Sequence, residues 1–268
     1  MVEAYLIALT GLIVSMFGSV MGAGGGFLLV PALVALTGLT PPKIAGTSLL
    51  FVLCGKSASW IGYHRLGVVD YRVGRLFMLP LIAGVVFGYT LNSHLTVRQF
   101  SISLAAVMAL MGLLIFKHSR LHIPHLPGHN INVHGHVRDR DGHDFDYDLG
   151  MRRSVLMGFV TGTCVPLFGI GGSVLLVPLL ITGFGMPEKV AAGTGQFVTL
   201  SAAAPGALLY VWGAHIDPAV AAPLCVAALV GATIGTRTGY GMCQRTLRLM
   251  MSGLLFIAAM MLGISALV

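Results

Sequence analysis

The sequence predicts an all-α, polytopic integral membrane protein built from two inverted repeats. Of its 268 residues, 56% are hydrophobic and only 9% are charged, whereas a soluble domain would carry about 25% charged residues. Apolar stretches long enough to cross a hydrocarbon core of about 30 Å fill nearly the whole chain. Strand-length alternation of apolar and polar residues is absent, so we expect the spanning elements to be helices.

Ten helical elements are expected, five on each side of one polar segment. They cover residues 4–21, 27–37, 44–63, 73–91 and 97–116, and then 153–168, 173–184, 190–212, 218–238 and 247–267. The second element of each set would reach only about 18 Å, which is too short to cross a bilayer. We therefore predict eight to ten membrane helices, two of them short, with one repeat over 1–116, a linker loop over 117–152 and the second repeat over 153–268.

A shift of 147 positions aligns the two halves. Between residues 22–88 and 169–235 there are 18 identities in 67 positions without a gap, and Leu-Leu-Val-Pro occurs in both copies. Shared membrane composition would give about half as many identities and would not hold one register. The identities therefore indicate an internal duplication.

Loop charge predicts that the copies are inverted. With five elements per half, thirteen Lys and Arg residues fall on one side of the membrane and two, Lys43 and Arg98, on the other. If each short element and its neighbour are counted as a single crossing, the Lys and Arg residues divide nine to six between the two sides, which is a weaker bias. The first count places the linker loop in the cytoplasm and both termini outside, by the positive-inside rule. An odd number of crossings per half makes the repeats inverted.

Two glycine clusters precede the short elements and are the first candidate site. Glycine lets a chain leave helical geometry within the membrane, and the freed backbone groups must then line a cavity or be buried in protein. The helix N-termini that follow would favour an anion. An alternative is that these glycines only allow close helix packing, which we expect for Gly84-x-x-x-Gly88 and Gly231-x-x-x-Gly235. The candidates here are Gly24, Gly25, Gly26, Phe27, Gly171, Gly172 and Ser173.

Polar residues in the third element of each half are the next candidates. Thr47 and Ser48 lie in the first half, and Thr194, Gln196, Thr199 and Ser201 in the second. Such groups can donate to an oxyanion, although they more often bond to backbone or to a neighbouring helix. Lys56 lies near the middle of its span without a charged neighbour. It is either a contact for an anion or a side chain that extends to the membrane surface.

Carboxylates are scarce outside the polar segment. The exceptions are Glu3, Asp70, Glu188 and Asp217, so the sequence offers no chain of buried acids for a proton pump and no cage for a cation. Asp70 and Asp217 are equivalent in the two repeats and are expected to cap the helices that follow them. No enzyme motif, cofactor or nucleic-acid partner is expected.

The polar segment is rich in histidine and aspartate. It holds seven of the ten histidines, and His134 and His136 are weak candidates for a metal site. A solvated cytoplasmic linker explains this composition as well. The alternative function is therefore a membrane protein that handles or senses metal through this loop. A membrane scaffold without transport activity is a third possibility.

Several motifs together resemble a known family. They are Gly22-x-Gly24-Gly25-Gly26 followed by Leu-Leu-Val-Pro, then Ala45-Gly46-Thr47-Ser48-Leu49 and Tyr63-x-x-x-Gly67-x-x-Asp70, with the order repeated in the second half. This pattern resembles the sulfite exporter family TauE/SafE. The resemblance implies a multi-pass transporter in the cytoplasmic (inner) membrane that exports sulfite, an organosulfonate or another small anion. Lys56 and the histidine-rich segment match no feature of the family pattern.

Overall fold

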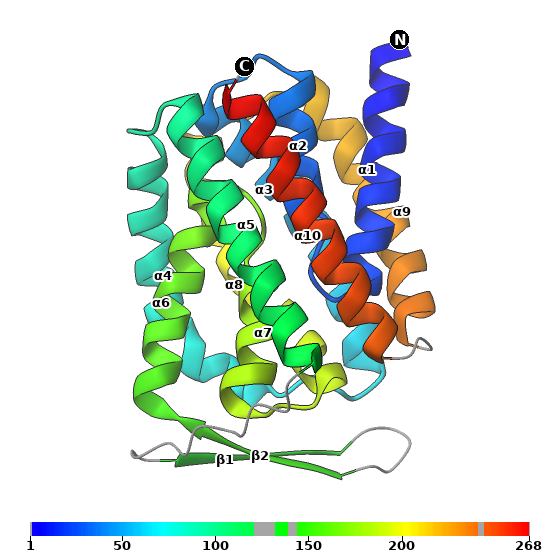
Figure 1. The fold of residues 1–268 in the computed structure, drawn as a ribbon, viewed down its shortest axis with the longest axis vertical. Coiled ribbons are helices and arrows are strands. Elements are labelled where there is room, and N and C mark those ends of the chain that lie inside the picture. The colour runs from blue at the N-terminus through cyan, green and yellow to red at the C-terminus, as the bar shows by residue number, and fades with distance from the viewer. Residues whose placement is uncertain (1, 121–131, 139–143, 241–243, 268) are drawn as a thin grey trace.

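The computed structural model describes residues 2–120, 132–138, 144–240 and 244–267. These form a bundle of ten α-helices and one two-stranded antiparallel hairpin (Figure 1). The first half contains α1 (Val2–Val20), α2 (Gly26–Leu36), α3 (Pro41–Arg65), α4 (Tyr71–Asn92) and α5 (Val97–Arg120). The hairpin follows as β1 (Asn132–Arg138) and β2 (Asp144–Gly150). The second half contains α6 (Met151–Phe168), α7 (Ser173–Phe184), α8 (Glu188–Trp212), α9 (Pro218–Tyr240) and α10 (Gln244–Leu267).

The outer surface of the bundle is apolar, as a lipid-facing surface must be. Leu79 is 83% exposed, and large apolar side chains are also exposed along α5, α6, α9 and α10. Within the described ranges, four helices are long and apolar enough to cross a membrane, and they are Pro41–Arg65, Tyr71–Asn92, Val97–Phe116 and Pro218–Gly239. Exposed apolar area of this extent is not tolerated in water. The prediction of a polytopic, helical membrane protein is confirmed.

The two short elements are helices, as predicted. α2 has 11 residues and α7 has 12, so neither reaches across a bilayer. A turn of irregular backbone precedes each one, and in these turns Gly24 has a φ of 73° and Gly171 a φ of 77°. Other residues rarely adopt this left-handed conformation, which explains why glycine stands at both positions.

The two halves pack into each other and repeat their contacts. α4 packs along α6 while α9 packs along α1, and α3 contacts α9 while α8 contacts α4. A shift of 147 residues converts each pairing into the other. The glycine pairs show the same exchange in detail, because Gly84 lies against Phe159 and Thr163 of α6, and Gly231 lies against Leu12 and Met16 of α1. The expected packing role of these glycines is confirmed.

The helix directions agree with an inverted duplication. Both termini lie at one end of the bundle and the hairpin lies at the other, so α1 starts at the terminal end and its equivalent, α6, starts at the hairpin end (Figure 1). The relation of either end to the cytoplasm stays a prediction.

Two aspartates cap the helices that follow them. The side chain of Asp70 accepts hydrogen bonds from the backbone nitrogens of Arg72 and Val73, at 2.8 and 3.2 Å. Asp217 accepts one from the backbone nitrogen of Ala219 at 3.0 Å. Both predicted caps are confirmed.

Candidate functional site

Lys56 lies in α3 at the centre of a buried polar cluster. Its side chain is 1% exposed. The ammonium group donates to the hydroxyl oxygens of Ser173 and Thr199 and to Oε1 of Gln196, at 2.8 Å for Thr199 and 3.3 Å for Gln196. Ser173 is the first residue of α7, and the other two lie one turn apart on α8. Lys56 therefore does not extend to the membrane surface. It joins the first half of the chain to the second.

The glycine breaks make room for this side chain. A Cβ atom on Gly24 would lie 3.1 Å from Nζ of Lys56, and a Cβ atom on Gly171 would lie 2.9 Å from Cε. Gln196 also donates through Nε2 to the carbonyl oxygen of Gly22 at 2.8 Å. The two breaks and the third helix of each half thus meet around one ammonium group.

The electrostatics of the cluster favour an anion. Among the residues that the structure describes, the hydrogen-bond partners of the Lys56 ammonium are all neutral oxygens. Its partner Ser173 lies at the N-terminus of α7, where the helix dipole contributes a further partial positive charge of about one half. A buried cation beside a positive helix end is costly without a compensating negative charge. A small anion bound here would supply that charge.

Three other predicted residues hold the halves together at a distance from Lys56. Ser48 donates to the carbonyl oxygen of Gly169 at 2.9 Å. Thr194 accepts from the backbone nitrogen of Asp70 at 2.9 Å, and Thr47 accepts from the backbone nitrogen of Asp217 at 3.3 Å. The last two contacts are equivalent under the 147-residue shift. These hydroxyls bond to backbone groups of the opposite half. Of the two roles that the sequence left open for them, this is the commoner one.

The remaining glycine-cluster candidates pack against protein. A Cβ on Gly25 would lie 2.9 Å from the ring of Phe51, and one on Gly26 would lie 2.9 Å from the carbonyl oxygen of Gly169. Gly172 lies beside Val165 and Thr199, and Phe27 is fully buried in the hydrophobic core. We assign these four positions to close packing, whereas Gly24, Gly171, Ser173 and Gln196 lie next to Lys56, as does Thr199.

Two threonines complete the surroundings of the cluster. The sequence marked Thr199 only as one of several hydroxyls, yet it bonds to both Lys56 and Ser173, each at 2.8 Å. Its position three residues after Gln196 places both on one helix face, which is the signal that could have singled it out. Thr161 was missed. It is fully buried, and its methyl carbon would lie 3.1 Å from a Cβ on Gly172. Its hydroxyl has no hydrogen-bond partner among the described residues.

Among the side chains that the structure describes, no group of three or more His, Cys, Asp or Glu residues is placed to hold a metal ion. The backbone of His134 and His136 is described in β1, but their side chains lie outside the described part of the chain. The antiparallel register sets His134 opposite Asp148 and His136 opposite Asp146.

Together, the apolar surface, the two broken elements and the buried cation between them define a multi-pass membrane protein of the transporter class. Residues 7–262 match the family described as Sulfite exporter TauE/SafE. The chain belongs to this family, and the resemblance seen in its motifs is confirmed.

Similar proteins carry transporter names. The chain is 27% identical over 253 residues to the "Probable membrane transporter protein YunE" of Bacillus subtilis, covering 92% of both chains. It is 27% identical to a "Probable membrane transporter protein" of Xylella fastidiosa, covering 81% of this chain and 77% of the relative. It is 24% identical to the "Probable membrane transporter protein MJ0441" of Methanocaldococcus jannaschii, covering 93% of this chain and 91% of the relative. No solved structure matches the chain.

Proposed function

We propose that this protein exports a small sulfur-containing oxyanion, such as sulfite or an organosulfonate, across the cytoplasmic membrane by alternating access. The observation that carries the proposal is the buried Lys56 ammonium, which has only neutral oxygens as recorded partners and lies beside the N-terminus of α7. The Lys56 ammonium and the hydroxyl groups of Ser173 and Thr199 lie within hydrogen-bonding distance of one another, and each can donate to a compact oxyanion, which accepts several hydrogen bonds at once. The family description supports the sulfur chemistry.

The burial of the cluster supports alternating access. Lys56, Ser173, Gln196 and Thr199 are each at most 1% exposed, so the described conformation is closed to both sides of the bundle. Substrate entry requires the interface between the halves to open. The reciprocal packing of α4 on α6 and of α9 on α1 gives two equivalent interfaces at which such opening could alternate.

Transport by the purified protein tests the proposal directly. Proteoliposomes containing the full chain should move sulfite faster than protein-free liposomes, and excess sulfite or a small organosulfonate should compete. Chloride at the same concentration serves as the control for a general anion pathway. If neither sulfite nor an organosulfonate is bound or moved, the substrate part of the proposal is wrong. Loading the anion on one side only, with the protein oriented, measures the direction.

The register of the hairpin favours a second candidate, metal binding by the cytoplasmic loop. Alternate positions of a strand share one face, so His134 and His136 of β1 and Asp146 and Asp148 of β2 occupy the same face of the ribbon. Histidine and aspartate at these register positions are residue types that bind zinc.

We therefore expect the purified protein to bind zinc through this face. In a zinc titration followed by calorimetry, replacing His134 and His136 together by alanine should remove the binding event. His94→Ala, at an exposed histidine between α4 and α5, is the matched control and should leave it intact. Zinc binding that survives the double replacement would contradict this assignment. Sulfite transport by the same variant shows whether the hairpin is needed for transport at all.

A further inference from the structure

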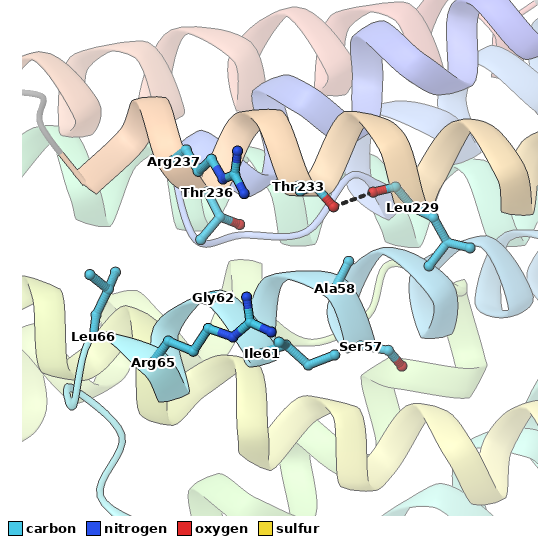
Figure 2. Close-up of a pocket in the computed structure, with 10 residues that line it drawn as sticks. All are labelled: Ser57, Ala58, Ile61, Gly62, Arg65, Leu66, Leu229, Thr233, Thr236 and Arg237. Atoms are coloured by element: carbon cyan, nitrogen blue, oxygen red, sulfur yellow. Dashed lines mark hydrogen bonds between the residues drawn. The ribbon is translucent and has the colours of Figure 1, made fainter.

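A groove of about 620 Å³ runs between α3 and α9 on the outside of the bundle (Figure 2). One side belongs to the last turns of α3, and the other belongs to the second half of α9. Arg65 and Arg237 lie toward one end of the groove, and Ser57 and Leu229 lie toward the other (Figure 2). Its lining consists of Ser57, Ala58, Ile61, Gly62, Arg65, Leu66, Leu229, Thr233, Thr236 and Arg237.

The groove combines an apolar wall with a basic end. Ile61 is 44% exposed and Leu229 is 45% exposed, so both present apolar surface toward the lipid. Arg65 is the last residue of α3, and Arg237 lies in the last turn of α9. Within the described ranges, no ion pair is recorded for either guanidinium. This arrangement suits a lipid at the membrane surface, with its acyl chains against the apolar wall and its headgroup at the basic end.

The groove is not part of the Lys56 site. At 100° per residue, Arg65 lies about 180° around α3 from Lys56, and Ile61 lies about 140° away. The residues that share the Lys56 face, such as Val52, turn toward the glycine breaks instead. α3 itself therefore separates the groove from the polar cluster, which argues against a passage for the transported anion.

The floor of the groove keeps its two walls close together. Gly62 lies against Thr236, and a Cβ atom on Gly62 would lie 2.8 Å from the methyl carbon of Thr236. This contact brings α3 and α9 together near the arginines, so the two guanidinium groups belong to helices in direct contact. Arginine is suited to such a site because its planar fork binds phosphate oxygens in pairs.

We propose that this groove binds an anionic phospholipid, with the headgroup phosphate between Arg65 and Arg237 and an acyl chain along Ile61 and Leu229. The lipid would lie against one helix from each half, α3 and α9. It would thus stabilise an interface between the halves. The proposal depends on the membrane location of the protein and not on the identity of its substrate.

The test compares lipids that differ only in headgroup. Full-length protein in detergent is titrated with phosphatidylglycerol or with phosphatidylcholine of the same chains, and lipid adducts are counted by native mass spectrometry. We expect preferential binding of phosphatidylglycerol. Arg65→Gln and Arg237→Gln should each weaken it roughly fivefold, and the double variant should lose the preference. Arg75→Gln, at an exposed arginine near the start of α4 and outside the groove, should bind as the wild type does.

Further measurements separate the alternatives. Thr233→Trp fills the groove and keeps both arginines, so it should also reduce lipid binding. Circular dichroism of every variant checks that the helices are intact. Equal binding of the two lipids, or unchanged binding in the intact double variant, would overturn the proposal. Displacement of the lipid by inorganic phosphate or sulfite at millimolar concentration would also overturn it, because the groove would then be a site for free anions. Unchanged sulfite transport by the double variant in phosphatidylcholine liposomes would support the separation of the two sites.

Discussion

Replacing Lys56 by methionine should abolish anion transport while leaving the fold intact. Methionine keeps the unbranched shape of the side chain but removes the buried ammonium, which lies within hydrogen-bonding distance of Ser173, Gln196 and Thr199. Removing one partner of a buried charge interaction costs about 3 kcal/mol or more, which corresponds to roughly 150-fold in affinity. Initial rates in proteoliposomes should fall by at least about 100-fold on the same grounds.

The Lys56→Met variant should be at least as stable as the wild type. Because the ammonium has only neutral recorded partners, its removal should leave the unfolding temperature in detergent unchanged or raise it. Lys43→Met is the matched control, since Lys43 is an exposed lysine in the first turn of the same helix, and it should transport normally. A folded Lys56→Met protein that transports at the wild-type rate would exclude Lys56 from the mechanism.

Alanine at Gly84 or at Gly231 should strongly destabilise the protein. A Cβ atom at position 84 would lie 2.7 Å from the backbone nitrogen of Thr163, and closer still to the carbonyl oxygen of Phe159. At position 231 it would lie 2.5 Å from the carbonyl oxygen of Leu12. These neighbours are backbone atoms and cannot turn away, so a pair of helices must separate. We expect each replacement to lower the free energy of unfolding by about 3 kcal/mol.

The control for this experiment is a helix glycine without neighbours. Gly253 of α10 is exposed, and nothing lies within 4 Å of a Cβ atom built there. Gly253→Ala should therefore be neutral or stabilising by up to about 1 kcal/mol, since alanine favours helix more than glycine does. Thermal unfolding in one detergent compares the three variants. Similar losses at Gly84 and Gly231 would support the equivalence of the two interfaces, whereas a loss at one position alone would contradict it.

Much of the helical architecture was predictable because membrane helices follow simple rules of length and polarity. Ser173–Phe184 was predicted with the bounds that the structure shows, and the other helices differ from their predicted ends by a few residues. The caps were predictable as well, because Asp70 and Asp217 act on backbone groups two or three residues away. The two-stranded hairpin was not expected. The sequence was interpreted only as a polar linker there, although the alternation of Asp144, Asp146 and Asp148 with Phe145, Tyr147 and Leu149 is the pattern of a strand.

The candidate site was predicted only in part. Polar residues in membrane helices could be identified from sequence, but their partners could not. Thr47 and Thr194 look like better site residues than Thr199, since they are identical in both repeats, yet they bind the backbone of the opposite half. Thr199 lies at the position of Val52 in the duplication and nevertheless contacts Lys56. The arginines of the α3–α9 groove were counted only as loop charge.

The sequence alone determined the membrane environment and the two short elements, because each depends on composition or on residues close together in the chain, and it predicted the duplication. The tertiary structure decided which groups meet. A shift of 147 residues places Ala203, Gly26, Leu49 and Val52 at the positions that correspond to Lys56 and its three partners, so the polar cluster is not repeated in the other half. Lys56 is separated from its three partners by 117, 140 and 143 residues. Only the packing of α3 against α7 and α8, made possible by glycine at positions 24 and 171, brings them to one ammonium group.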